Sequence, residues 1–406
     1  MNSPTNRVVV VNYNGGDQTR ACLDALLAND SDRQLEIVLI DNASTDGLIE
    51  QISNELPAVR IIRSETNLGF GGANNLALAD LTGIEFVALI NSDARVRSGW
   101  LEPLQTALRA DPTLGAACPR ITLAGEFVKI TITTERAITV AGVTVDGQDT
   151  SARMQYGDTF GAPEPPAPKA PRARRLHGSG CLWVPVNPDT KSVLLSVLDG
   201  GPAVFHAGSE VVTSDRARAE RTVEVPIGPT RVRLLNNTGN YWTSEGFSAD
   251  RGWLQPDTPN QFAVSDLVET WCGAAVLLRS DYLRATGGFN AKLFLYYEDI
   301  DLAERGKNLG WRYRYIPNST VEHDHASSTG EDSLLALRLT ERNRLIVNGR
   351  YRNHRMRSTL RSLIATGGYV RRDIFYRPLR RRWPRISVIA ARLRATAGSA
   401  KISLEK

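Results

Sequence analysis

The chain has 406 residues, of which 42% are hydrophobic and 23% are charged, and its formal net charge is +5. This length allows a large buried core and two or three domains, and the composition excludes a disordered or membrane-spanning class for the whole chain. The polar residues 1–7 lead directly into a short apolar run, so we expect no signal peptide and a cytoplasmic protein. The scattered cysteines predict reduced packing residues rather than disulfides or zinc ligands: Cys22, Cys118, Cys181 and Cys272.

The first hundred residues alternate short apolar runs with amphipathic segments, as is typical of a mostly parallel sheet with helices on both faces. We expect strands at residues 8–11, 37–40, 61–62 and 86–91. The intervening helices are expected around residues 23–27, 48–56, 73–77 and 100–108. The pattern therefore predicts a doubly wound nucleotide-binding half.

The pattern changes after this half, because residues 127–235 consist of short β-type runs separated by Gly and Pro. Within them, the Pro-rich residues 162–175 are expected to form an exposed linker or long loop. Alternation then returns, with strands expected at 272–278 and 311–316 and helices at 293–305 and 333–350. The predicted organisation is a nucleotide-binding half (1–123), a β-rich insert (124–235), a second α/β half (236–350) and a basic helical tail (351–406).

Polar residues follow four of the predicted strands, at the edge where ligands bind in open α/β sheets. They are Asn12 and Asn14; Asp41 and Asn42; Asn67, Gly69, Phe70 and Asn74; and Asn91, Ser92 and Asp93. Any one group is equally typical of turns and helix caps. Together they would line one crevice suited to a base, a ribose and a diphosphate. The sequence has no dinucleotide fingerprint after the first strand and no phosphate-binding lysine loop, which argues against a dehydrogenase or a P-loop enzyme.

Carboxylates and histidines supply candidate metal and acid–base groups. Asp93 ends an apolar strand, where a carboxylate is costly unless it is capped, paired or bound to a cation such as Mg²⁺ or Mn²⁺. Glu298, Asp299 and Asp301 begin a predicted helix, where they would either cap it and pair with Arg305 or provide a general base. His323 and His325 lie on one side of an extended segment, as metal ligands or as surface residues.

These segments, taken in chain order, resemble the family 2 inverting glycosyltransferases, especially the bacterial branch of rhamnosyltransferases and galactofuranosyltransferases of cell-envelope polysaccharides. The resemblance covers roughly residues 8–123 and 235–350 and rests on the motifs at 12–14, 40–47, 67–74, 90–93, 297–301 and 310–311. It implies a GT-A fold and a nucleotide diphosphate sugar as donor.

The resemblance also implies roles for single residues. Asp41 would contact the nucleotide base, Asp93 and His323 would bind a divalent metal, and Asp299 would be the catalytic base. Trp271, Glu298 and Asp301 would border the acceptor. In many relatives the metal motif reads Asp-x-Asp, whereas this chain has Asn91-Ser92-Asp93 and so has one carboxylate fewer. Arg342 and Arg344 would either approach a diphosphate or form surface salt bridges.

The C-terminal region concentrates positive charge. Residues 350–394 contain 14 arginines and one acid, Asp373, a net +13 that leaves −8 for the rest of the chain. A solvated face and a nucleic-acid patch are possible interpretations, but the interleaved apolar residues favour a helix at an anionic membrane surface, through residues 351–395. We therefore expect a peripheral protein at the inner face of the cell membrane, with no nucleic-acid partner.

These residues favour one of three candidate functions. The leading hypothesis is an inverting glycosyltransferase that acts on a glycan or lipid-linked acceptor. The alternative is a non-catalytic glycan-binding or scaffold protein on a degenerate transferase fold, against which the presence of Asp41, Asp93, Asp299 and His323 argues. A sugar-1-phosphate nucleotidyltransferase would need a Gly-rich, Lys-bearing loop after Val11, which this sequence lacks.

Overall fold

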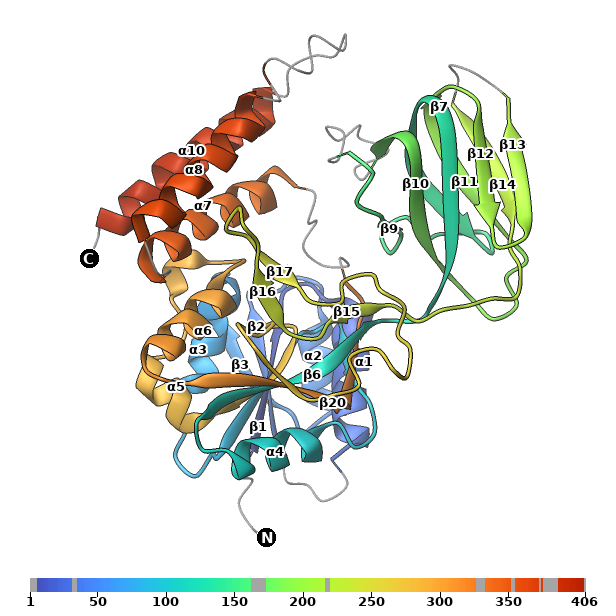
Figure 1. The fold of residues 1–406 in the computed structure, drawn as a ribbon. Helices are drawn as coiled ribbons and strands as arrows, with labels where there is room; N and C mark the ends of the chain where they lie inside the picture. The colour runs from blue at the N-terminus through green and yellow to red at the C-terminus, as the bar shows by residue number, and fades with distance from the viewer. Residues whose placement is uncertain are drawn as a thin grey trace.

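A computed structural model of the chain describes residues 6–30, 35–161, 173–215, 220–325, 333–351, 355–371, 374 and 386–404. Its main sheet has the strand order β18-β20-β6-β19-β4-β1-β2-β3, and helices cover both faces (Figure 1). Alternate residues of each strand enter separate cores: Val8 and Val10 pack with α1, α2 and α4, whereas Val9 packs with α3, α5 and α6. The expected α/β fold class is confirmed.

The nucleotide-binding half has the predicted elements. They are β1 (Asn6–Asn12), α1 (Gly16–Ala28), β2 (Leu35–Asn42), α2 (Leu48–Glu55), β3 (Arg60–Ser64), α3 (Gly69–Leu78), β4 (Phe86–Ile90), β5 (Ala94–Val96) and α4 (Leu101–Ala110). β1 pairs in parallel with β2 and β4, and β2 pairs in parallel with β3. All four strands therefore bring their carboxyl ends to one edge of the sheet.

The rest of the sheet is mixed in direction and differs in places from the sequence-based expectation. Its strands are β6 (Leu114–Leu123), β15 (Leu235–Asn237), β18 (Asp266–Val268), β19 (Ala275–Arg279) and β20 (Arg312–His323). The helices between β19 and β20 are α5 (Ser280–Thr286) and α6 (Glu298–Asn308). The strand expected from residue 272 begins at Ala275, and the helix expected from 293 begins at Glu298. A short 3₁₀ turn, Ala291–Leu293, and positive φ angles at Phe294, Tyr296 and Tyr297 delay this helix.

Residues 126–226 form a separate antiparallel sheet beside the main one (Figure 1). Its strands are β7 (Glu126–Val145), β8 (Gln148–Asp149), β9 (Gln155–Tyr156), β10 (Arg174–Val186), β11 (Ser192–Gly200), β12 (Ala203–Ala207), β13 (Glu210–Ser214) and β14 (Arg221–Pro226). The long β7 pairs with β12 through its first half and with β11 through its second, around a core of its own. The β-rich character is as expected. The Pro-rich stretch lies outside the described residues up to 172, but Arg174 and Arg175 already belong to β10.

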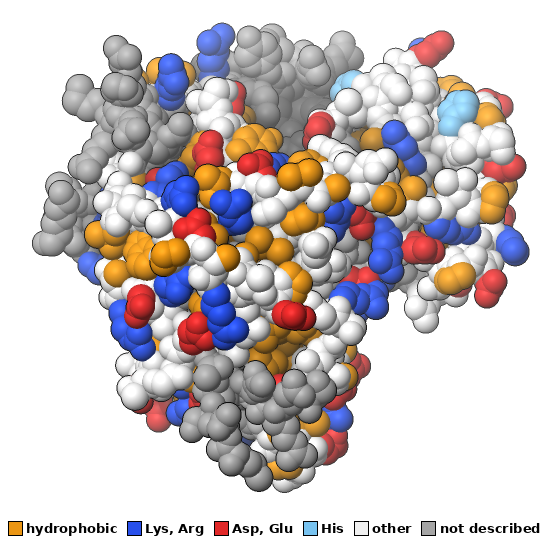
Figure 2. Space-filling view, turned by 60° about the horizontal axis from the view of Figure 1, so that its bottom comes forward, with side chains coloured by type: hydrophobic (Ala, Val, Ile, Leu, Met, Phe, Trp, Pro, Cys, Tyr) orange, Lys and Arg blue, Asp and Glu red, His pale blue; other side chains and the backbone are white. Residues whose placement is uncertain are grey.

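Among the described residues after the sheet, the helices α7 (Leu334–Tyr351), α8 (Arg355–Arg371) and α10 (Ile386–Leu404) lie side by side at the C-terminal end (Figure 1). The basic segment is not only a surface feature, because Arg392 of α10 is buried and ion-paired with buried Glu341 of α7. Elsewhere, Figure 2 shows basic and acidic side chains interspersed on one face of the molecule. In the part of the chain that the structure describes, no helix has the length and apolar character needed to cross a membrane.

Candidate active site

A cavity opens at the carboxyl ends of β1, β2 and β4, where α3 begins. It is lined by Val11, Tyr13, Asn42, Asn67, Gly69, Phe70, Asn91, Ser92, Asp93, Phe294 and Leu295. Seven of the eleven residues expected to bind the donor are therefore at one place: Asn42, Asn67, Gly69, Phe70, Asn91, Ser92 and Asp93. The parallel arrangement explains this, since strands that run together end together.

A network of amides ties the end of β2 to the start of α3. Asn42 accepts a hydrogen bond from the backbone N–H of Leu68 (2.8 Å) and donates to Asn67 Oδ1 (3.0 Å). Asn67 Oδ1 also accepts from the N–H of Gly69 (2.9 Å). Gly69 has a φ of +72°, and a Cβ there would lie 2.1 Å from the carbonyl oxygen of Phe294. Only glycine lets the donor-side loop approach the loop before α6 this closely.

Four other residues expected at the donor lie outside this cavity. Asn12 braces the β1–α1 turn, accepting from Gly15 N (3.1 Å) and Thr19 Oγ1 (2.7 Å). The Asn14 side chain accepts a hydrogen bond from the N–H of Thr45 (2.7 Å), and the Asp41 carboxylate accepts one from the N–H of Ser44 (3.0 Å). Asn74 is buried and donates to the Phe70 carbonyl (2.9 Å). The buried side-chain amides of Asn12 and Asn74 therefore support the β1–α1 turn and the start of α3, and they do not line the cavity.

A second cavity, of about 290 Å³, continues from the first and shares Phe70, Asn91, Asp93 and Leu295 with it. Its wall includes Glu298 and Asp299 at the start of α6 and His323 at the end of β20. Asp299 Oδ2 accepts from the N–H of Gly273 (3.0 Å) and Oδ1 from the N–H of Ile300 (2.8 Å). The expected base thus lies in a cavity that joins the donor cavity.

Burial raises the pKa of the acids in this second cavity. The pKa of Asp299 is raised by burial, which outweighs the hydrogen bond from Gly273 N–H. The pKa of Glu298 is raised further, well above the ordinary value, by burial and then by the charge of Asp299. The Oε2 atom of Glu298 has no hydrogen-bond partner among the described residues. Two adjacent carboxyls with raised pKa values in a cavity are typical of acid–base sites.

Asp93 and His323 come together although 230 positions separate them in the sequence. Their Oδ1 and Nε2 atoms are 3.1 Å apart, and both side chains are nearly buried. On the other side of the ring, His323 Nδ1 lies 2.6 Å from Asn236 Oδ1. Because an amide oxygen only accepts, His323 donates from Nδ1 to Asn236, and its Nε2 faces Asp93 either as a lone pair or, in a protonated ring, as a second donor. A lone pair facing a carboxylate is an arrangement that a cation stabilises.

The loop between the 3₁₀ turn and α6 is held from α7 by one side chain that sequence reasoning missed. Asn343 is fully buried, and its Nδ2 donates to the carbonyls of Leu293 (2.9 Å), Leu295 (3.0 Å) and Tyr296 (2.6 Å). The loop needs this support, because three non-glycine residues in it have positive φ angles. Asn343 therefore fixes the backbone that presents Glu298 and Asp299.

Asn343→Ala should lower kcat by about tenfold or more, because the loop carrying Asp299 loses its brace. Asn348→Ala is the comparison variant: this amide is equally buried on α7 but donates to the Gly246 carbonyl (2.7 Å), next to the residues Ser248 and Asp250 that line the second cavity, so its loss should act on acceptor KM more than on kcat. Both variants should lose similar thermal stability, on the order of 1–3 kcal/mol for unsatisfied carbonyls. Equal kcat losses in the two variants would mean that Asn343 supports the fold alone.

Four other residues named from the sequence do not line the cavities. Trp271 is fully buried in a core beside Phe289, and it precedes β19 rather than opening it. Asp301 is fully buried and pairs with Arg305 (3.1 Å), as the alternative interpretation has it. Arg344 is fully buried, where it pairs with Glu341 (2.6 Å) and stacks on Phe247, which corrects both expectations for it. Arg342 donates to the carbonyls of Lys292 and Leu293.

The charge of the joined cavities is one-sided. Asp93, Asp250, Glu298 and Asp299 line them, together with His323 and His325, and no Lys or Arg is among the described lining residues. Asp250, Asn236 and Asn240 come from the segment after the insert and were not identified from the sequence. The run Asn236-Asn237-Thr238-Gly239-Asn240 was the available signal, since buried amides between apolar strands need a polar purpose.

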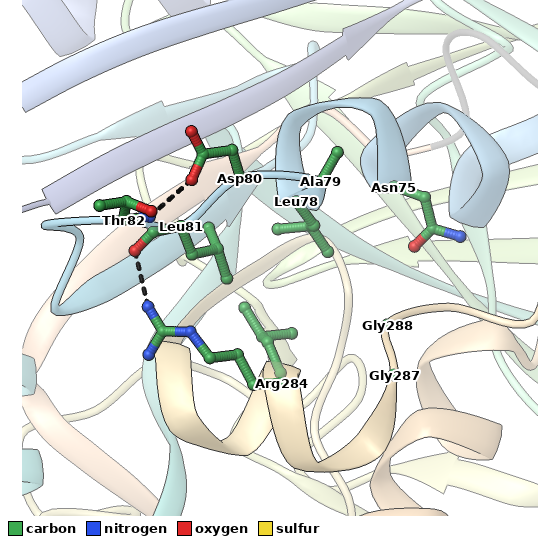
Figure 3. A pocket seen from close by; sticks show the side chains of 10 residues that line it. Asn75, Leu78, Ala79, Asp80, Leu81, Thr82, Arg284, Gly287 and Gly288 are labelled. Carbon is green, nitrogen blue, oxygen red and sulfur yellow. Dashed lines mark hydrogen bonds between the residues drawn. The ribbon is translucent and has the colours of Figure 1, made fainter.

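Another hollow, of about 530 Å³, lies between the end of α3 and α5, well away from the strand ends (Figure 3). Its charged side chains are occupied by neighbouring backbone: Arg284 Nη2 donates to the Leu81 carbonyl (2.7 Å), and the Asp80 carboxylate accepts from Thr82 N–H (2.9 Å). It lacks the convergent acids of the strand-end cavities, so we place the active site at the strand ends.

A parallel nucleotide-binding half that meets a second half bearing acids is the arrangement expected of the GT-A fold. Residues 7–158 match the family model described as Glycosyl transferase family 2. Over these residues the chain is similar to the family 2 glycosyltransferases.

Relatives of known sequence and structure agree with this assignment. The chain is 24% identical over 336 residues to the N-acetylglucosaminyl-diphospho-decaprenol L-rhamnosyltransferase of Mycobacterium tuberculosis, covering 80% of this chain and 78% of the relative. It is 32% identical over 123 residues to the uncharacterized glycosyltransferase YibD of Escherichia coli, covering 29% and 35%. The crystal structure of GalNAc-T7 with UDP, GalNAc and Mn²⁺ superposes with a TM-score of 0.51 at 13% identity. That match covers 100% of this chain and 56% of the other, and it supports the fold alone.

Proposed function

We propose that this glycosyltransferase transfers a sugar with inversion from a nucleotide diphosphate donor to a hydroxyl of a glycan or lipid-linked acceptor. The observation that carries the proposal is the continuity of the two cavities, because it brings the strand-end amides and Asp93 within the same site as Asp299. The donor would occupy the cavity at the strand ends, and the acceptor the cavity beside Asp299. Asp41, Asn12, Asn14 and Asn74 would contribute by shaping the donor loops.

The reaction would be a direct displacement. Asp299 accepts the proton of the acceptor hydroxyl as its oxygen attacks the anomeric carbon, and the bond to the nucleotide diphosphate breaks on the opposite face. The hydrogen bonds from Gly273 and Ile300 hold the Asp299 carboxylate in a fixed orientation for this transfer. Burial raises its pKa, which makes it a stronger base than an exposed Asp.

Asp93 and His323 fit a divalent cation, Mg²⁺ or Mn²⁺. Asp93 Oδ1 and His323 Nε2, which lie 3.1 Å apart, would hold the cation between them, and oxygen and imidazole nitrogen are ligands that such ions accept. Among the described residues no third His, Cys, Asp or Glu completes a site with them, so the donor's phosphates would supply further ligands. A bound cation would offset the charge of the diphosphate leaving group, for which the described lining residues provide no Lys or Arg.

The mycobacterial relative suggests the substrates to test first. Its name specifies L-rhamnose as the sugar and a diphosphate-linked lipid carrying N-acetylglucosamine as the acceptor. We extend this to the present chain as a rhamnosyl transfer in cell-envelope polysaccharide synthesis. A lipid-linked acceptor agrees with a basic C-terminal region, residues 351–395, that binds an anionic inner membrane surface. Cosedimentation with anionic vesicles at physiological salt tests that placement, and a protein that stays in the supernatant would exclude it.

The decisive experiment is a screen of the full-length protein with nucleotide diphosphate sugars, including a nucleotide diphosphate rhamnose. It is run with Mn²⁺, with Mg²⁺ and with a chelator. We expect release of nucleoside diphosphate from one donor, abolished by the chelator and accelerated by an N-acetylglucosaminyl diphosphate acceptor bearing a short prenyl chain. A protein that binds glycans but releases no nucleotide from any donor would instead support the alternative of a non-catalytic scaffold.

A further inference from the structure

A short hairpin after the insert closes one side of the second cavity. It consists of β16 (Asn240–Trp242) and β17 (Ser248–Asp250), and it stands at the carboxyl edge of the main sheet (Figure 1). Asn240, Ser248 and Asp250 all line the cavity that contains Asp299. The hairpin therefore forms the wall of this cavity, whereas the strand ends form the donor side.

The hairpin is fixed from two directions. Its turn is held from α7, since Asn348 Nδ2 donates to the Gly246 carbonyl (2.7 Å) and Arg344 Nη1 to the Glu245 carbonyl (3.1 Å). Its second strand is held from the catalytic loop, because the N–H of Ser248 donates to the Tyr297 hydroxyl (3.1 Å). Tyr297 directly precedes Glu298 and Asp299, so the wall and the base are parts of one rigid frame.

Asp250 places a carboxylate on this wall with one oxygen fixed and one available. Asn237 Nδ2 donates to its Oδ1 at 2.6 Å, and no hydrogen bond to Oδ2 is formed by the described residues. Glu298, on the same cavity, likewise has an oxygen that is buried without a partner in the described chain. Both groups thus have an oxygen that no described residue hydrogen-bonds, and the buried one, on Glu298, is costly until a ligand pairs with it.

The chemistry of these groups restricts the ligand. The sugar of the acceptor suits this space better than its diphosphate, because ionised Asp250 and Asp299 line the space and would repel a phosphate group. A metal ion is not favoured either, because Asp250 does not gather with Asp93 and His323 into a metal-binding group within the described residues. Sugar hydroxyls, in contrast, donate hydrogen bonds and carry no charge, so they satisfy free carboxylate oxygens without repulsion.

We infer that Asp250 binds a hydroxyl of the acceptor sugar and so helps to orient the attacking hydroxyl toward Asp299. This inference rests on the proposed function, and it assigns a specificity role to a residue of the segment that follows the β-rich insert. Burial, together with the charge of Asp299, raises the pKa of Asp250 to about 6. The group is therefore ionised, and a strong acceptor, above that pH.

The test is Asp250→Asn, which keeps an oxygen for Asn237 but removes the charge that strengthens the bond to the acceptor. Asp266→Asn is the matched control, because Asp266 is exposed on β18 and pairs with Arg251 outside the cavity. Both variants are assayed at pH 8 with Mn²⁺, nucleotide diphosphate rhamnose and the short-chain N-acetylglucosaminyl diphosphate acceptor. Donor hydrolysis without acceptor is measured on the same samples as a check of the folded donor site.

For Asp250→Asn we expect an acceptor KM raised about tenfold, with donor KM and acceptor-free hydrolysis within twofold of wild type. Asp266→Asn should match wild type throughout. An unchanged acceptor KM would overturn the role of Asp250 and leave the proposed function intact. Loss of acceptor-free hydrolysis in Asp250→Asn would also overturn it, because the residue would then serve the donor or the fold. Wild-type protein that neither hydrolyses nor transfers from any donor would sink the proposed function and this inference together.

Discussion

Replacing Asp299 with Asn is expected to lower kcat on the order of 1,000-fold, while binding of the nucleotide sugar is retained. A general base contributes roughly 100- to 10,000-fold to a proton transfer, and the neutral amide cannot accept the acceptor's proton. Donor binding should survive because Asp299 lies in the second cavity and outside the donor cavity. Steady-state transfer assays together with calorimetric titration of the donor with Mn²⁺ separate the two effects.

Wild-type pH dependence gives an independent measure of the same group. Burial raises the pKa of Asp299, so its active, ionised form is lost as the pH falls through that raised value, at a higher pH than for an exposed Asp. The acidic limb of the kcat profile should disappear from the residual activity of Asp299→Asn. Glu298→Gln is the neighbouring control, and near-normal transfer by Asp299→Asn would remove that residue from the mechanism.

The donor half of the site could be anticipated because it depends on local sequence. Each polar group directly follows an apolar run, and parallel strands necessarily end at one edge, so Asn42, Asn67, Asn91 and Asp93 could be brought together from spacing alone. Asp299 required the family resemblance, since its helix-capping interpretation was equally consistent with the local pattern. Its role as the base stays a prediction, as do the domain boundaries.

The acceptor half could not be anticipated, because its geometry depends on long-range contacts. Asp301 and Trp271 were assigned to the acceptor from their motif positions, yet the turn of α6 directs Asp301 to Arg305, and Trp271 packs into the core. Asp250 reaches the cavity only because a hairpin folds back after the insert. Likewise, the contact between Asn343 and the strained loop spans about fifty residues, and no local periodicity encodes it.

Asp93→Ala should weaken both cation and donor binding, since Asp93 is the one carboxylate of the Asn91-Ser92-Asp93 segment. Loss of a group that merely orients a metal ligand costs about 10- to 100-fold in affinity, so loss of a direct ligand should cost at least on the order of 100-fold. The donor KM should rise in parallel, because the phosphates would lose the cation that offsets their charge, and no Lys or Arg among the described lining residues replaces it. Binding of Mn²⁺, measured by electron paramagnetic resonance with and without nucleoside diphosphate, reports the first effect directly.

Ser92→Ala is the matched control, because it alters the adjacent residue of the same loop and removes a hydroxyl rather than a charge. Its Mn²⁺ affinity should stay within a few-fold of wild type. His323→Ala should also lower the affinity for Mn²⁺, as Asp93→Ala does, since His323 Nε2 lies 3.1 Å from Asp93 Oδ1. If Asp93→Ala bound Mn²⁺ as tightly as Ser92→Ala, the cation would lie elsewhere. In that case Asp93 and His323 would form an ion pair in which the protonated imidazole donates a hydrogen bond from Nε2 to Asp93 Oδ1.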